Sequence, residues 1–169
     1  MQNSRLALDV MGGDRAPEAI VDGALMACDP LGSQRIPPER VLLVGDEKLV
    51  HELLAKRGGN PGFAVQHASQ TIGMEDKPAT ALRTKPDSSI VRSVEAVRSG
   101  SAGALVSMGN TGAVVGAATL SLGTLAGVKR PGIAVSLELG GTPVTLIDMG
   151  ANVVPKPQHL FQYGVMGSV

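Results

Sequence analysis

The sequence predicts an α/β fold with a mostly parallel sheet. Short runs of β-branched and aliphatic residues alternate along the chain with longer segments whose apolar residues repeat at helical spacing, and this alternation is typical of strands joined by helical crossovers. The pair Gly140-Gly141 separates the last two apolar runs. Because a two-residue glycine turn closes a tight hairpin, we expect antiparallel pairing there and hence a partly mixed sheet.

Three strands and two helices are expected before residue 70. The strands are Leu6–Val10, Val41–Val44 and Phe63–His67. The first helix begins near Pro17, since proline is favoured in a first turn, and ends before Pro30. The second helix, Asp46–Arg57, carries its apolar residues on one face, and the glycines after it end it. A polar loop over residues 68–77 is long enough to suggest a functional role.

The rest of the chain is expected to add three helices and three strands. The helix Ser89–Arg98 leads to the apolar strand Ala104–Ser107. The uncharged run Gly112–Val128 is interpreted as a buried helix, because it is shorter than the roughly 20 residues that span a bilayer. The hairpin strands and the last helix are Ile133–Leu139, Pro143–Asp148 and Pro157–Val169. No linker divides the chain, so a single domain over residues 1–169 is expected.

Composition excludes several classes of protein. Lys and Arg number 15, Asp and Glu also number 15, and there is no Trp, so neither a strong positive field nor a base-stacking platform for nucleic acid is expected. Cys28 is the one cysteine, which excludes an internal disulfide and a cysteine zinc site and suits a reducing compartment. No targeting segment is visible at the N-terminus. A cytoplasmic protein is expected.

Polar, glycine-rich turns follow three of the expected strands. These turns span residues 9–14, 107–112 and 148–152, and ligands of open α/β sheets bind where the carboxyl ends of strands meet. In the second turn, Gly109 and Gly112 let backbone N–H groups approach an anion, and Asn110 or Thr111 can cap the following helix. Phosphate is the ligand that fits such a turn. An equally favoured interpretation involves no ligand: the glycines only allow a tight turn from strand to helix, and Asn110 only caps that helix.

Acidic residues in the first and third turns have two possible roles. Asp9 and Asp148 end apolar strands, where a carboxylate needs partners. Each can orient a ligand, or each can accept hydrogen bonds within its own turn, and the second role is slightly favoured. Asp14 stands three residues before Pro17 and is expected to cap the first helix.

The segment 73–87 is the most basic surface that the sequence offers. Lys77, Arg83 and Lys85 could steer phosphate or an acidic protein, although a solvated helical face explains most such patterns. Lys129-Arg130 forms a second basic point after a helix, where cations are favourable.

Familiar catalytic motifs are absent. The sequence has no phosphate-binding loop of the Gly-x-x-x-x-Gly-Lys type, no Gly-x-Gly-x-x-Gly after a strand, no zincin motif and no Gly-x-Ser-x-Gly elbow. No metal or cofactor is expected. A reaction on this chain would therefore depend on positioning and on electrostatic stabilisation of bound groups.

Seven ordered motifs make the chain resemble one family, the PlsX-type phosphate acyltransferases of bacterial phospholipid synthesis. The motifs are Asp9-Val10-Met11-Gly12-Gly13-Asp14 with Ala16-Pro17-Glu18, Ile72-Gly73-Met74, Lys77-Pro78-Ala79, Asp87-Ser88-Ser89-Ile90, Gly109-Asn110-Thr111-Gly112-Ala113, Gly150-Ala151-Asn152 and Met166-Gly167-Ser168-Val169. The resemblance implies a three-layer α/β/α fold, like those of isocitrate dehydrogenase and phosphotransacetylase, and transfer of a fatty acyl group from acyl carrier protein to inorganic phosphate. It also implies a homodimer with peripheral contact at the inner membrane face.

The resemblance also suggests roles for individual residues. The expected catalytic residues are Asn110, Asp9, Asp148 and Asn152, and the expected phosphate-binding residues are Gly109, Asn110, Thr111, Gly112, Gly12 and Gly13. All of them are expected to line one crevice. Family members are longer, so this chain matches a truncated, N-terminal half. A non-catalytic fragment that only binds acyl carrier protein or a partner chain is the alternative. A phosphotransacetylase-like or dehydrogenase-like enzyme would need an arginine-rich motif or an Asp cluster, and the sequence has neither.

Overall fold

The computed structural model describes residues 4–32, 35–150, 152 and 154–168. The chain divides into two compact units, Met1–Leu122 and Gly123–Val169. The expectation of a single domain over residues 1–169 stays a prediction.

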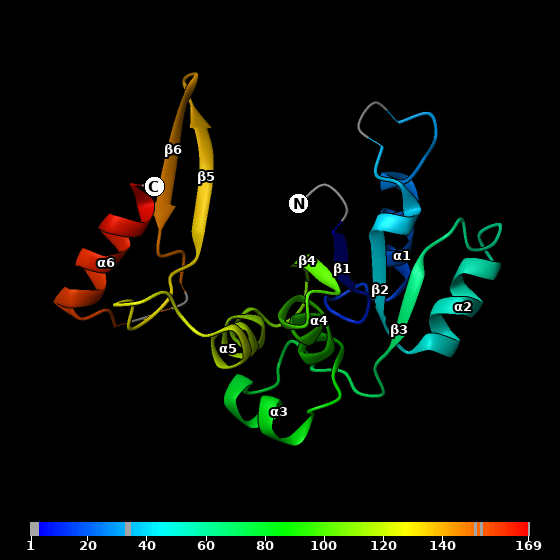
Figure 1. The fold of residues 1–169 in the computed structure, drawn as a ribbon, viewed down its shortest axis with the longest axis horizontal. Helices are drawn as coiled ribbons and strands as arrows, with labels where there is room; N and C mark the ends of the chain where they lie inside the picture. The colour runs from blue at the N-terminus through cyan, green and yellow to red at the C-terminus, as the bar shows by residue number, and fades with distance from the viewer. Residues whose placement is uncertain (1–3, 33–34, 151, 153, 169) are drawn as a thin grey trace. The chain divides into compact units, whose positions relative to one another are not determined.

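The first unit is built on a parallel sheet of four strands in the order β3-β2-β1-β4 (Figure 1). The strands are β1 (Arg5–Asp9), β2 (Val41–Gly45), β3 (Ala64–His67) and β4 (Ala102–Val106). The helices are α1 (Glu18–Ala27), α2 (Glu47–Ala55), α3 (Pro78–Thr84), α4 (Ser89–Arg98) and α5 (Thr111–Leu122), with a short 3-10 helix at Pro38–Arg40. Helices flank the parallel sheet, so the α/β fold is confirmed, and the arrangement is consistent with three layers.

Alternate residues of β2 face two different cores, as the pleat of a strand requires. Leu43 packs with residues of α1 and α2, among them Val21 and Leu54. Leu42 and Val44 belong to the opposite cluster, which includes Ala96 of α4. A third cluster joins α3, α4 and α5 through small and branched side chains: Ile72, Ala81, Ile90, Val94, Ala113 and Ala117. A sheet covered on both faces explains why the run Val41–Gly45 is buried throughout.

The sequence predicted most helices of this unit but not their details. Asp46 caps α2 by accepting a hydrogen bond from Leu49 N–H at 3.1 Å. The expected cap Asp14 was wrong, because the N-cap of α1 is Pro17 and no side chain caps it. Helix α5 ends at Leu122 rather than at residue 128, because Gly123 adopts a φ of +77° and ends the helix.

The second unit contains a β-hairpin and one helix. Strands β5 (Ala134–Leu139) and β6 (Thr142–Ile147) pair antiparallel, with Gly140 at φ +58° and Gly141 at φ +81° between them. Positive φ at both central residues is the requirement of a tight hairpin turn, so the predicted hairpin is confirmed. It forms a two-stranded sheet of its own, which corrects the expectation that it extends the parallel sheet. Helix α6 (Pro157–Gly167) follows, and Val169 lies outside the described residues.

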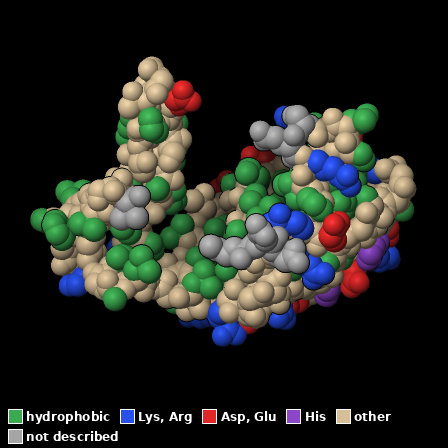
Figure 2. All heavy atoms as spheres, turned by 45° about the horizontal axis from the view of Figure 1, so that its top comes forward, with side chains coloured by type: hydrophobic (Ala, Val, Ile, Leu, Met, Phe, Trp, Pro, Cys, Tyr) green, Lys and Arg blue, Asp and Glu red, His purple; other side chains and the backbone are tan. Residues whose placement is uncertain are grey.

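Hydrophobic side chains lie on the surface of the second unit (Figure 2). In α6, Leu160 is 57% exposed, Phe161 73% and Val165 51%. No helix among residues 4–32, 35–150 and 154–168 has the length and apolar character needed to cross a membrane.

Three ion-paired aspartates make the stability of the first unit depend on pH. Hydrogen bonds from Ser69 and then from Arg92 hold the pKa of Asp87 far below its ordinary value. Lys85 lowers the pKa of Asp76, and Arg57 lowers that of Asp22. A depressed pKa contributes stability above the unfolded-state value near 3.9, and this stability is lost as pH falls through the folded-state value.

We therefore expect the urea midpoint to fall between pH 5 and pH 3. The variant Asp87→Asn should be less stable than the unchanged chain at pH 7 and should show a smaller fall, because its ion pair is already absent. Asp14→Asn, at an exposed carboxylate outside these ion pairs, is the control and should keep the full fall. Equal falls in the unchanged chain and in Asp87→Asn would contradict the assignment.

Candidate functional site

The turns that follow β1 and β4 lie at the switch point of the sheet. Strand β1 pairs with β2 on one side and with β4 on the other, so the chain order of the strands reverses direction between β1 and β4. Ligands of open parallel sheets bind at this point, outside the carboxyl ends of the strands. The sequence placed two of its three glycine-rich turns at these two ends, and their convergence is confirmed.

The two turns touch each other through glycine backbones. A Cβ on Gly12 would lie 2.7 Å from the Gly109 nitrogen and 2.9 Å from its Cα, and closer still to Asp9 Oδ2. Gly13 has a φ of +108°, and a Cβ there would lie 3.1 Å from the Met108 carbonyl oxygen. Gly12 is therefore glycine because the backbone of Gly109 lies too close for a side chain there, whereas a Cβ on Gly109 would be a tight contact, 3.2 Å from the Gly12 Cα.

Asp9 is fully buried beneath this contact. Its Oδ1 accepts a hydrogen bond from Met11 N–H at 3.1 Å, which is the role within its own turn that the sequence favoured. Its Oδ2 accepts a hydrogen bond from the Ser107 hydroxyl at 2.6 Å. The Ser107 oxygen in turn accepts from Gly109 N–H at 3.0 Å. Sequence reasoning missed Ser107, whose partner lies 98 residues away in the chain.

Asn110 joins the second turn to the loop before α3. Its Oδ1 accepts from Ala113 N–H at 3.0 Å and so caps α5, as predicted. Its amide nitrogen lies within hydrogen-bond distance of three carbonyl oxygens, those of Gly73 and Met74 at 3.2 Å and of Asp76 at 2.9 Å. The side chain is 7% exposed and both its ends bind protein groups. These contacts account for both ends of the side chain, and a catalytic role of Asn110 stays a prediction.

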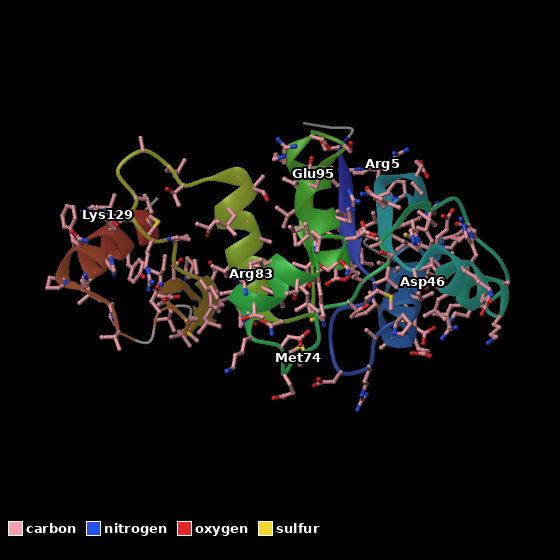
Figure 3. All side chains as sticks on the ribbon, turned by 90° about the horizontal axis from the view of Figure 1, so that it is seen from below. Arg5, Asp46, Met74, Arg83, Glu95 and Lys129 are labelled. Carbon is pink, nitrogen blue, oxygen red and sulfur yellow. The ribbon has the colours of Figure 1, made fainter. Side chains whose placement is uncertain are left out.

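The loop that Asn110 holds is also fixed by Lys85. The ammonium of Lys85 donates to Asp76 Oδ2 at 2.5 Å and to the Thr71 carbonyl at 2.9 Å. Lys85 is thus engaged within the loop, whereas Lys77 and Arg83 are exposed at α3. Figure 3 shows Arg83 on α3 and Met74 in the loop before it. Of the three cations predicted to steer phosphate or an acidic protein, Lys77 and Arg83 are therefore the two whose side chains are exposed.

The N-terminus of α5 presents backbone N–H groups beside these turns. No hydrogen bond within the described part of the chain uses the N–H groups of Asn110, Thr111 and Gly112, as is usual for the first turn of a helix. The helix carries no charged residue, so the positive end of its dipole is uncompensated within it. Gly112 has a second role: a Cβ there would lie 2.6 Å from Pro78 Cγ, so it permits close packing on α3.

Asp148 and Asn152 belong to the second unit and contact each other. Asp148 Oδ2 accepts hydrogen bonds from Asn152 N–H at 2.8 Å and from its amide nitrogen at 3.0 Å. Asp148 Oδ1 accepts from Ile133 N–H at 2.9 Å, and Asn152 Oδ1 accepts from Arg130 at 2.8 Å. The Asn152 amide also donates to the Tyr163 hydroxyl, at 2.6 Å.

The surroundings of Asp148 and Asn152 also raise the pKa of the neighbouring Tyr163. Burial raises the pKa of Tyr163, and the negative charge of Asp148 raises it further. That Asp148 and Asn152 share one crevice with Asp9 and Asn110 stays a prediction. No group of three or more His, Cys, Asp or Glu in the described residues could hold a metal ion.

Comparison with known proteins identifies the family. A family model described as fatty acid synthesis protein matches residues 4–169. A phosphate acyltransferase of Myxococcus xanthus (strain DK1622) is 47% identical over 165 residues, which are 96% of this chain and 45% of that protein. A phosphate acyltransferase of Pelotomaculum thermopropionicum is 44% identical over 163 residues, 96% of this chain and 46% of that protein.

The chain thus spans about half the length of the curated relatives that it matches. The resemblance seen in the sequence is confirmed over nearly the whole chain. The chain belongs to the family of fatty acid synthesis proteins that contains the PlsX-type phosphate acyltransferases.

Proposed function

We propose that the protein transfers a fatty acyl group from the thioester of acyl carrier protein to inorganic phosphate, which yields an acyl phosphate. The observation that carries this proposal is the contact between the turns after β1 and β4, beside the N-terminus of α5. Unused N–H groups at a helix N-terminus favour an anion, and phosphate is the anion whose oxygens suit several such donors. The name of the relatives, phosphate acyltransferase, agrees with this ligand.

The reaction requires the protein mainly to position the two substrates and to stabilise negative charge. A phosphate oxygen attacks the thioester carbonyl, a new C–O bond forms, and the C–S bond breaks as the thiolate leaves and takes up a proton. The N–H groups of Thr111 and Gly112 would hold phosphate in place for this attack, and neighbouring N–H groups would stabilise the negative charge that develops on the carbonyl oxygen. The mechanism uses the N–H groups of the turn rather than the Asn110 side chain, whose amide is already bonded.

Charge steering is a second part of the proposal. Lys77 and Arg83 are exposed, and α3 contains no acidic residue. Positive side chains beside a phosphate site increase the rate of encounter with phosphate and with an acidic carrier protein. Lys85 contributes less, because Asp76 neutralises it at 2.5 Å.

The transfer reaction is tested directly with the purified protein, acyl carrier protein charged with a fatty acyl thioester, and inorganic phosphate. Acyl phosphate is separated from the acyl thioester by chromatography, so product and thioester loss are measured together. We expect acyl phosphate only when phosphate and the charged carrier are both present. Thioester loss without phosphate dependence, or no loss at all, would contradict the proposal. Carrier binding without turnover would favour the alternative of a chain that only binds.

Self-association through α6 is also proposed, with a second copy of the chain as the partner. Phe161 is 73% exposed, and burial of such a side chain is worth about 1.5–3 kcal/mol. Phe161→Glu should therefore weaken self-association about tenfold or more in sedimentation velocity. Met26→Glu, at a residue 76% exposed on α1, is the matched control and should change nothing.

Two results would contradict the prediction for α6. One is an unchanged chain that sediments as a monomer, and the other is a Phe161→Glu variant that associates normally. If Phe161→Glu self-associates normally but no longer binds anionic lipid vesicles that the unchanged chain binds, this face of α6 contacts a membrane instead.

A further inference from the structure

Ser107 is the first residue of the second of the two turns that form the candidate phosphate site. It follows β4, and its hydroxyl donates to Asp9 Oδ2 at 2.6 Å while its oxygen accepts from Gly109 N–H at 3.0 Å. One oxygen atom thus connects the turn after β1 to the turn after β4. This hydrogen bond to Asp9 spans 98 positions of the chain.

The two hydrogen bonds fix the peptide between Met108 and Gly109. Its N–H points to Ser107, and its carbonyl oxygen lies 3.1 Å from the position of a Cβ on Gly13. Glycine backbone is otherwise free to adopt many conformations. Rotation of this peptide would change the direction of the N–H groups that follow it, which are those proposed to hold phosphate.

Ser107 also binds the buried carboxylate of Asp9. Asp9 has no exposed surface, and its two oxygens accept from Met11 N–H and from the Ser107 hydroxyl. A buried carboxylate that loses a donor is strongly destabilised or rearranges toward another partner. The Gly109 N–H is such a partner, because it loses its own acceptor together with the Ser107 hydroxyl and Gly109 lies against Asp9 Oδ2, which is 3.2 Å from the position of its Cβ. That rearrangement would bring the negative charge to the phosphate turn.

We propose that Ser107 is a positioning residue for phosphate: through Asp9 and Gly109 its hydroxyl holds the 109–112 turn in the conformation that binds the anion. This inference rests on the proposed function, because it presumes that phosphate binds at that turn. Ser107 acts through the turn and does not itself contact the reacting atoms. Its hydroxyl is therefore needed for phosphate affinity and not only for folding.

The test measures phosphate affinity and folding separately. Inorganic phosphate that binds the folded state raises the melting temperature by mass action, and the dependence on its concentration gives a Kd. The melting temperature without phosphate reports the fold, and sodium chloride at equal ionic strength is the reference. Ser107→Ala, Ser107→Thr and the matched control Ser101→Ala, at an exposed serine, are compared with the unchanged chain.

We expect Ser107→Ala to raise the phosphate Kd about tenfold, while Ser107→Thr, which keeps the hydroxyl, stays within about threefold of the unchanged chain. Ser101→Ala should bind normally. If Ser107→Ala does not fold, Ser107→Cys replaces it; it keeps a weaker donor and should show an intermediate Kd. Normal affinity in folded Ser107→Ala, or Ser107→Thr as weak as alanine, would overturn the proposal.

The outcomes separate this inference from the function on which it rests. If the unchanged chain binds phosphate and Ser107→Ala binds it equally well, only the role of Ser107 is wrong. If the unchanged chain shows no phosphate-dependent stabilisation, the phosphate site itself is wrong, and Ser107 has no anion to position.

Discussion

Replacement of Gly12 by alanine is expected to lower the free energy of unfolding by about 3 kcal/mol, the upper part of the usual range for overpacking. The added Cβ would lie 2.7 Å from the Gly109 nitrogen and 2.9 Å from its Cα, and these are backbone atoms that cannot rotate away. The turns after β1 and β4 must separate to admit it. Urea unfolding, followed by circular dichroism, measures the loss.

Gly23→Ala is the matched control for this experiment. Gly23 lies inside α1, and a Cβ there would meet no atom within 4 Å. Alanine in a helix interior is favoured over glycine by roughly 0.5–1 kcal/mol, so this variant should be slightly more stable than the unchanged chain. A Gly12→Ala variant that unfolds like Gly23→Ala and still binds phosphate normally would contradict the contact between the two turns.

The substitution Asn110→Asp should have a comparable effect and lower the free energy of unfolding by about 3 kcal/mol. The aspartate side chain would keep the oxygen that caps α5 but lose the amide that faces the carbonyls of Gly73, Met74 and Asp76. Buried groups left without a partner cost about 1–3 kcal/mol each, and a carboxylate would repel these oxygens in addition. The loop over residues 73–76 should then be released from α5.

Asn60→Asp provides the comparison. Asn60 is exposed, and its amide donates to one carbonyl, that of Phe63 at 3.0 Å, while its oxygen accepts from two backbone N–H groups. Asn60→Asp should therefore lower the free energy of unfolding by only about 1 kcal/mol. Limited proteolysis checks the released loop: faster cleavage at residues 73–77 in Asn110→Asp than in Asn60→Asp is expected. Equal stability and equal cleavage of the two variants would show that the Asn110 amide does not hold the loop.

Local patterns in the sequence predicted the elements whose structure is set locally. The Gly140-Gly141 turn, the start of α2 at Asp46 and the two turns after β1 and β4 all follow from residues within a few positions of one another. Helix α3 escaped prediction because it has seven residues, too few to show a hydrophobic period. Pro78 at its first position was the available signal, since proline is favoured there.

Long-range partners decide the roles that the sequence left open. Lys85 was one of three cations expected to steer phosphate or an acidic protein, but the loop before α3 brings Asp76 to it. Ser107 follows β4 as an ordinary strand end, and only the pairing of β4 with β1 places it against Asp9. Asn110 was ambiguous between a cap and a ligand residue. The cap is confirmed, and three carbonyls 34–37 residues earlier account for its amide.

The central claim is that phosphate binds where the turns after β1 and β4 meet the start of α5. A titration of the isotope-labelled chain with inorganic phosphate, followed by its backbone amide resonances, tests this most directly. We predict saturable shifts at Gly12, Gly13 and residues 109–112, with none in α1 or α2 beyond those that sodium chloride produces. Absence of a saturable shift at Thr111 and Gly112, or saturable shifts confined to Lys129 and Arg130, would contradict it.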